Sequence, residues 1–243
     1  MRWLKRLGLA TLIVGLLASG LYWLWWASTQ SPEFYRVVEQ QLANPVERKH
    51  VAQEFVEQSQ QFVEEMKTSP QWTREFTDAQ INAWLIEDFP REFADAIPSE
   101  VSQPRVKIGR DGIRIGVKVD QAGQWNGIVS VHLKARMLAP NEVAIELKSI
   151  QAGLVPVPLK SVIEQINEQA QAHGIEVEWR REGDHELAIV RVTHEGPESP
   201  QLEQIEFREG AIRVTGSSPP KSGALQFAPV RLTQSHKQEA PGF

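Results

Sequence analysis

The feature that most constrains this chain is a long uncharged segment near its N-terminus. Three cations, Arg2, Lys5 and Arg6, precede the segment, and the next charged residue is Glu33. The stretch from Leu7 to Trp26 is long enough for a helix of about 30 Å, which matches the hydrocarbon core of a bilayer. We therefore predict an N-terminal transmembrane helix.

Aromatic residues mark the far end of this segment: Tyr22, Trp23, Trp25 and Trp26. Such rings favour the headgroup level of a membrane, whereas cations favour its cytoplasmic side. We expect these four residues to lie at the membrane interface. The predicted localisation is a single-pass membrane protein with its N-terminus in the cytoplasm and its C-terminal domain outside.

A cleaved signal peptide is the alternative reading of the same segment. Ala18-Ser19-Gly20 is a small-residue cleavage candidate after a shorter apolar stretch. Cleavage would leave the aromatic residues at a mature N-terminus, so the length and the aromatic belt favour an uncleaved anchor. Both readings export the rest of the chain.

Charge and composition exclude several classes of function. Since three of the 26 Lys and Arg precede the anchor, the exported part keeps 23 cations against all 31 acids, a formal charge of −8. Nucleic acid binding needs a basic surface, so no nucleic-acid partner is expected. The absence of cysteine excludes disulfides, thiolate metal ligands and a Cys nucleophile. If the exported part meets lipid, apolar contact must dominate.

The sequence divides into four predicted regions. They are a membrane anchor with a short cytoplasmic N-terminus (1–32), a helical stalk or packing helix (33–75), an α+β extracytoplasmic domain (76–216) and a flexible tail rich in Pro and Gly (217–243). Asn44-Pro45 interrupts the second region, because proline breaks a helix.

The third region begins with a helix signal and continues with strand signals. Thr77 to Gln80 has capping-box spacing and opens a short helix that carries Trp84 and Leu85. After Pro104 apolar residues alternate with polar ones, and the runs are separated by turn dipeptides at Asp111-Gly112, Asn126-Gly127 and Pro140-Asn141. This pattern predicts antiparallel strands with one apolar face.

A second helix is predicted over Leu159–His173, with Val162, Ile163 and Ile166 on one face. Alternating strands resume after it, and Glu209-Gly210 is the turn of a last hairpin. The expected fold class is α+β: the N-terminal transmembrane helix, then an antiparallel curled sheet packed on or around amphipathic helices.

The geometry of such a sheet suggests a binding function. Seven or eight strands span roughly 35 Å, and one helix covers only about 10 Å of that width. Several helices can cover the apolar face, the sheet can curl around the Leu159–His173 helix, or the face can hold an apolar ligand or partner. The residues expected to line such a ligand site are Trp84, Leu85, Val162, Ile163 and Ile166.

The segment Phe76 to Leu85, the strand meander and Gly153-Leu154-Val155-Pro156-Val157-Pro158-Leu159 before a helix carry a resemblance. Together they resemble the YpmS-type family of single-pass bacterial envelope proteins and the wider tubular lipid-binding architecture. The resemblance covers about Phe76 to Thr215. It implies an anchored, outward-facing domain that binds lipid or another apolar molecule, and it supplies no catalytic residues.

The sequence has no signature of catalysis. The six histidines form no HExxH motif, and no GxSxG motif or glycine-rich phosphate loop is present. We expect no metal, no cofactor and no enzyme activity. A group of cations on predicted strands could receive an anionic partner, although pairing with neighbouring acids is the simpler account. This group is Lys118, His132, Lys134, Arg136 and Lys148.

The function expected from the sequence is therefore non-enzymatic binding of lipid or another apolar ligand between sheet and helix, in a domain anchored to the membrane. A protein-interaction scaffold in the cell envelope, with another envelope protein as its partner, is the alternative. An unrecognised envelope enzyme is a third and weaker reading.

Overall fold

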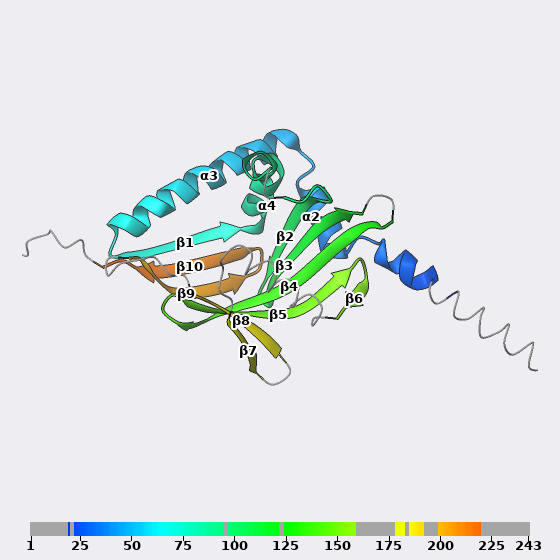
Figure 1. Ribbon diagram of the computed structural model, residues 1–243. Helices are drawn as coiled ribbons and strands as arrows, with labels where there is room; N and C mark the ends of the chain where they lie inside the picture. Colours follow the sequence, from blue (N-terminus) through cyan, green and yellow to red (C-terminus); the bar gives the residue numbers. More distant parts are fainter. Residues whose placement is uncertain are drawn as a thin grey trace, which may run out of the picture.

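The computed structural model describes residues 19, 22–94, 97–121, 124–158, 178–182, 185–191 and 199–219. Within these ranges the chain forms an α+β fold whose strand pairings are antiparallel (Figure 1). The α+β class and the antiparallel pairing predicted from the sequence are thus confirmed.

The helices and strands follow one another in a simple order. The helices are residues 22–28, α2 (Glu33–Gln41), α3 (Pro45–Thr68), α4 (Asp78–Glu87) and α5 (Phe89–Glu92). The strands are β1 (Gln71–Thr77), β2 (Val101–Gly109), β3 (Gly112–Asp120), β4 (Asn126–Ala139), β5 (Glu142–Ala152), β6 (Val155–Val157), β7 (Glu178–Glu182), β8 (His185–Arg191), β9 (Gln201–Arg208) and β10 (Ala211–Ser217).

These strands form two sheets. The larger sheet has the order β2-β3-β4-β5-β8-β7, with β6 also paired to β5, and the smaller sheet has the order β1-β10-β9. Figure 1 shows α3 running along the smaller sheet beside β1, and α4 contacts both α3 and β2. The helices α3 and α4 therefore connect the smaller sheet to the edge of the larger one.

Three of the predicted turns lie where expected, and one of them is Glu209-Gly210 between β9 and β10. Gly112 joins β2 to β3 with a φ of 131°, and a Cβ there would lie 2.1 Å from the backbone oxygen of Leu133. Asn141 joins β4 to β5 with a φ of 62°, and its side-chain oxygen accepts a hydrogen bond from Leu202 N at 2.7 Å. The Asn141 turn thus also ties β9 to the larger sheet. The turn predicted at Asn126-Gly127 is displaced, because both residues already belong to β4 and the connection from β3 lies between Asp120 and Asn126.

Helix starts in the first half of the chain follow the capping signals of the sequence. Asn44 precedes α3 and its side chain accepts a hydrogen bond from Val46 N at 3.1 Å, with Pro45 in the first turn. Thr77 caps α4 through the predicted capping box, in which Gln80 N donates to Thr77 Oγ1 at 3.2 Å and Thr77 N donates to Gln80 Oε1 at 3.0 Å.

The helix α3 packs against its own domain through aromatic rings. Phe62 lies 5.3 Å from Trp72 and 5.7 Å from Phe76 between ring centroids, and Phe55 lies 5.7 Å from Phe76. Trp72 and Phe76 belong to β1, which the sequence did not predict. The boundary drawn from the sequence between residues 75 and 76 therefore falls inside a strand.

The outer edge of the larger sheet is closed by polar contacts to β2, which we call the edge junction (Asp78, Asn82, Val106, Ile108 and Gly210). Asn82 is 1% exposed; its Nδ2 donates to Val106 O at 2.6 Å, and its Oδ1 accepts from Val106 N at 2.7 Å. Two residues on, Ile108 O accepts from Gly210 N at 3.0 Å, and Ile108 N is 3.4 Å from Asp78 Oδ2. These contacts replace the strand that β2 lacks on this side.

The main apolar core lies next to the edge junction. Its buried members are Leu85 from α4 with Val106 and Ile108 from β2. Partly buried side chains from both sheets and from α4 and α5 pack on them: Ile81, Trp84, Phe89, Ile113, Ile115, Phe207 and Ile212. The junction therefore holds together the elements that supply the core.

Several predicted segments lie outside the described residues. They are most of the predicted anchor Leu7–Trp26, the predicted helix Leu159–His173 with its side chains Val162, Ile163 and Ile166, and the tail from residue 220 on. Among the residues that are described, no helix has both the length and the apolar character needed to cross a membrane.

The edge junction makes a first prediction. Replacing Asn82 with Ala should lower the free energy of unfolding by about 2–4 kcal/mol, because it leaves the buried N–H and C=O of Val106 without partners. Thermal unfolding of the purified full chain in mild detergent measures the change. The matched control is Asn126→Ala, which removes an exposed hydrogen bond to Asp120 and should change the unfolding free energy by less than about 0.5 kcal/mol. Equal stability of the two variants would contradict the role given to Asn82.

Candidate ligand-binding site

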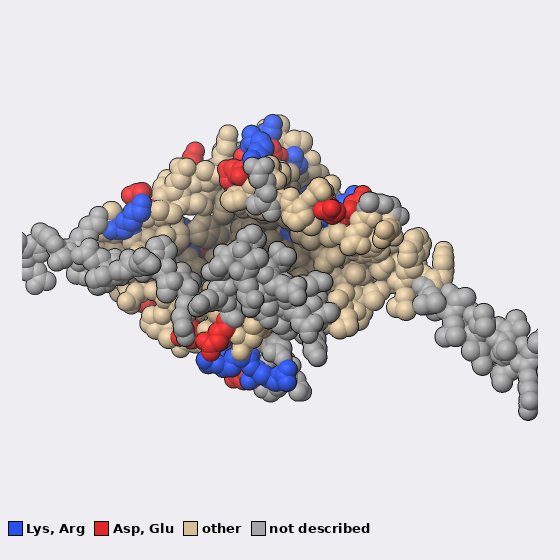
Figure 2. Space-filling view, in the orientation of Figure 1, with Lys and Arg blue, Asp and Glu red and all other residues tan. Residues whose placement is uncertain are grey.

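An open cavity of about 620 Å³ lies between α4, α5 and the first half of β2, and we call it the β2 pocket. Most of its wall is apolar, with Leu85, Ile86 and Phe89 on the helical side and Val101 and Val117 on the sheet side. Among the described lining residues, only Arg105 carries a charge. In Figure 2 the charged side chains gather mainly at the margins of the face shown, and the described surface between them is largely uncharged.

A β-bulge opens the sheet side of this pocket. Ser102 pairs with Lys118 and Arg105 pairs with Gly116, so Gln103 and Pro104 together stand opposite Val117. Gln103 has a φ of 51°, and Pro104 has no N–H to offer to a neighbouring strand. Bulges bend an edge strand and redirect its side chains. The pocket is therefore built where β2 departs from regular pairing.

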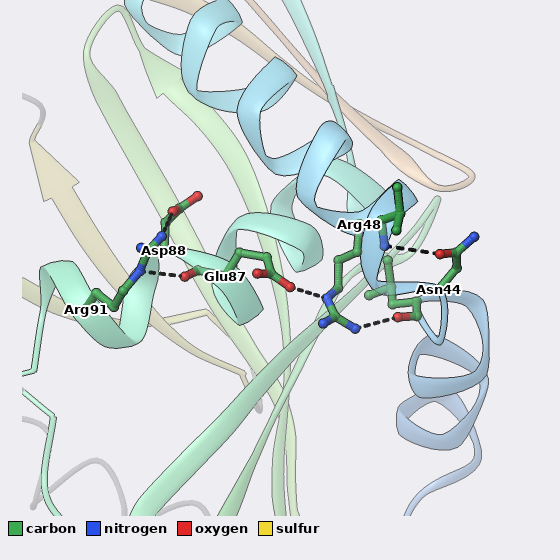
Figure 3. Close-up of polar contacts among 7 residues, drawn as sticks. Asn44, Arg48, Glu87, Asp88 and Arg91 are labelled. Carbon is green, nitrogen blue, oxygen red and sulfur yellow. Dashed lines mark hydrogen bonds and ion pairs between the residues drawn. The ribbon is translucent and has the colours of Figure 1, made fainter.

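A partly buried ion pair fixes the helical side of the pocket (Figure 3). Arg48 Nε donates to Glu87 Oε1 at 2.5 Å, and the two side chains are 20% and 16% exposed. Arg48 Nη1 also donates to Leu42 O at 2.9 Å, and Arg91 Nε donates to Glu87 O at 3.0 Å. The end of α4 is thus tied to the α2–α3 connection, which sets the position of α5 over the pocket.

The structure separates the two predicted ligand residues of α4. Leu85 is 9% exposed and lines the β2 pocket. Trp84 does not line it, because its ring packs among Phe55 at 5.8 Å, Phe89 at 5.3 Å and Phe93 at 6.2 Å between centroids. Trp84 is therefore a packing residue that holds α3, α4 and α5 together.

Arg105 follows the bulge and is 9% exposed. Its Nη1 donates to Pro104 O at 2.7 Å, its buried Nε has no hydrogen-bond partner, and its Cζ lies 5.8 Å from the centre of the Tyr35 ring. Tyr35 in turn donates its hydroxyl to Gln103 O at 2.7 Å. Burial lowers the pKa of Arg105 and raises the pKa of Tyr35 to about 12.

Sequence reasoning missed Arg105 as a site residue. An Arg in an alternating strand is normally an exposed residue of the polar face. Only Pro104 could have signalled that this stretch of β2 lies at a sheet edge, since proline is confined to edge strands and bulges.

The predicted interface residues sit on the helix 22–28 with their rings exposed. Tyr22, Trp23, Trp25 and Trp26 are 67%, 61%, 57% and 45% exposed. The other end of this helix is attached to the domain, because Leu154 N donates to Ala27 O at 3.0 Å and Trp125 Nε1 donates to Ser28 Oγ at 3.0 Å. The helix that carries the four exposed rings is thus directly joined to the domain.

Three of the five cations predicted on the polar face, His132, Arg136 and Lys148, have local acidic neighbours. Lys148 pairs with Glu146 at 2.6 Å, and Arg136 pairs with Glu182. His132 Nε2 is 3.5 Å from Asp111 Oδ2, and burial lowers the pKa of this histidine. These contacts favour charge pairing over an anionic partner at this face. Within the described ranges, no group of three or more His, Asp or Glu is placed to hold a metal ion.

Comparisons with family models, curated proteins and solved structures find no match to this chain. The β2 pocket and the N-terminal segment are therefore the features of the molecule from which a function can be inferred.

Proposed function

We propose that this chain is a membrane-anchored, non-enzymatic protein whose extracytoplasmic α+β domain binds the hydrocarbon part of a lipid, or another apolar molecule, in the β2 pocket. The observation that carries the proposal is the pocket itself. Its volume of about 620 Å³ is ordinary for a small-molecule site, and such sites are mostly apolar with few polar groups.

The location of the site differs in part from the site expected from the sequence. That site lay between the sheet and the Leu159–His173 helix and included Trp84. The proposed site keeps Leu85 but uses α4, α5 and the bulged half of β2. Binding by Val162, Ile163 and Ile166 stays a prediction, as do the curled sheet and the resemblance to the YpmS-type and tubular lipid-binding proteins.

The anchor is supported by charge and by exposed aromatic surface. The three N-terminal cations and the uncharged stretch after them fit a helix inserted with its N-terminus in the cytoplasm. The four exposed rings of residues 22–26 fit the headgroup region at the opposite side of the bilayer.

A lipid-retention experiment tests the proposed binding. The full chain, purified in mild detergent, should release lipid on organic extraction. Ile86→Trp should reduce the retained lipid at least twofold with a nearly unchanged melting temperature, because Ile86 lines the pocket and is only half-buried. We choose Ile86 over Leu85 because Leu85 belongs to the core, where a larger or charged side chain would unfold the domain.

The matched control is Val63→Trp, on the part of α3 that is exposed and outside the pocket. It should retain as much lipid as the parent protein. A parent protein free of lipid, with a clean mass in native mass spectrometry, would contradict the proposal and favour the envelope scaffold.

The proposed topology has its own test. A reporter that is active only in the export compartment, fused after Phe243, should be active in the full-length protein. A reporter active only in the cytosol should be silent at the same position. The reverse result would overturn both the orientation and the proposed extracytoplasmic function.

A further inference from the structure

The charge of Arg105 is not balanced by the part of the protein that the structure describes. No carboxylate of the described residues lies within ion-pairing distance of its guanidinium. Its one hydrogen bond is to the neighbouring carbonyl of Pro104, and its Nε is buried without a partner. A buried charge is normally paired, because leaving it unpaired is strongly unfavourable.

The nearest charged groups do not supply that pairing. Glu39 on α2 acts on Arg105 electrostatically but is exposed and forms no ion pair with it. Arg48 also acts on Arg105, and its own guanidinium is already engaged by Glu87 and Leu42. Since arginine stays protonated in proteins, Arg105 is a permanent positive charge in the wall of an apolar pocket.

We propose that the β2 pocket binds an anionic single-chain amphiphile whose carboxylate pairs with the Arg105 guanidinium. This inference rests on the proposed function and adds the class of ligand. The ligand's chain would lie against Leu85, Ile86 and Phe89, and its head would lie at the bulge, where Ser102 and Gln103 are the polar neighbours of Arg105.

The size of the pocket is compatible with a single acyl chain. Its volume of about 620 Å³ lies within the range of about 300–1,000 Å³ that is ordinary for sites of small ligands. A single-chain amphiphile is the smallest ligand that brings both an acyl chain and a charged head to this site.

The single positive charge in the pocket wall favours a head group with a single negative charge. Arg105 is the only charged group among the described lining residues, so the pocket offers one positive charge to its ligand. A carboxylate carries one negative charge and matches the planar guanidinium with two parallel hydrogen bonds. A phosphate monoester carries close to two negative charges at neutral pH and would stay partly uncompensated.

The test compares chain-matched ligands on the full-length protein. Delipidated protein in amphipol is titrated at pH 8 with palmitate, hexadecanol and hexadecyl phosphate, and adducts are counted by native mass spectrometry. Palmitate should bind about tenfold or more tightly than hexadecanol, as expected for a charge-assisted hydrogen bond, and more tightly than hexadecyl phosphate. Preference for the phosphate, or equal binding of palmitate and the alcohol, would overturn the inference.

Variants assign the preference to Arg105. Arg105→Gln should lose the preference for palmitate over hexadecanol while its affinity for hexadecanol stays within about threefold of the parent value. Arg105→Lys should show an intermediate preference for palmitate, because lysine keeps the positive charge but lacks the planar guanidinium. The control is Arg114→Gln, whose guanidinium is paired with Asp111 outside the pocket. Arg114→Gln should show the same preference for palmitate over hexadecanol as the parent protein.

The outcomes separate the two proposals. If the parent protein binds none of the three ligands, the proposed apolar site itself fails. If it binds hexadecanol and palmitate equally and Arg105→Gln changes nothing, the apolar site stands and only the role of Arg105 fails. Even if Arg105→Gln melts at a lower temperature, the comparison of the three ligands on the parent protein still shows whether the pocket prefers a carboxylate head group.

Discussion

The pairing between the Asn82 side chain and both backbone groups of Val106 is the contact on which the rest of the structure depends. An edge strand offers a row of unpaired N–H and C=O groups. Here the buried side-chain amide of Asn82 forms hydrogen bonds with both the N–H and the C=O of Val106, near the centre of β2. Because Asn82 lies on α4, this contact fixes the helix against the larger sheet. At Ile108 the same edge is bonded to Gly210, in the β9–β10 turn of the smaller sheet, and to Asp78 at the start of α4. The pocket begins where this coverage ends, at the bulge of Gln103 and Pro104.

The arrangement also relates the pocket to the membrane proposed for the N-terminal segment. Helix 22–28 is bonded to the domain through Ala27 and Ser28, so the exposed aromatic rings are held on the domain itself and not on a long flexible stalk. The next helix, α2, places Tyr35 against Arg105 at the pocket wall. In the proposed topology the domain would thus rest close to the outer leaflet.

The sequence predicted the features that depend on neighbouring residues. The capping box at Thr77, the break at Pro45 and the turn at Gly112 each follow from the chemistry of a few adjacent residues. It did not predict β1, because the partner of β1 is β10, more than a hundred residues further along the chain. The candidate site was predicted only in part: Leu85 lines the pocket, whereas Trp84 packs among rings of α3 and α5. Arg105 could not be predicted as a site residue, since its burial arises from the packing of α2 and from a bulge.

The most direct test of this account is the position of a bound ligand. A palmitate analogue with a photoreactive diazirine in the middle of its chain can be cross-linked to the full-length protein and the labelled residues identified by peptide mass spectrometry. The account predicts labels on the lining segments Leu85–Pro90 and 97–105, and loss of these labels when excess palmitate is added. Labels confined to the exposed rings of residues 22–26, or labels that excess palmitate does not displace, would contradict it.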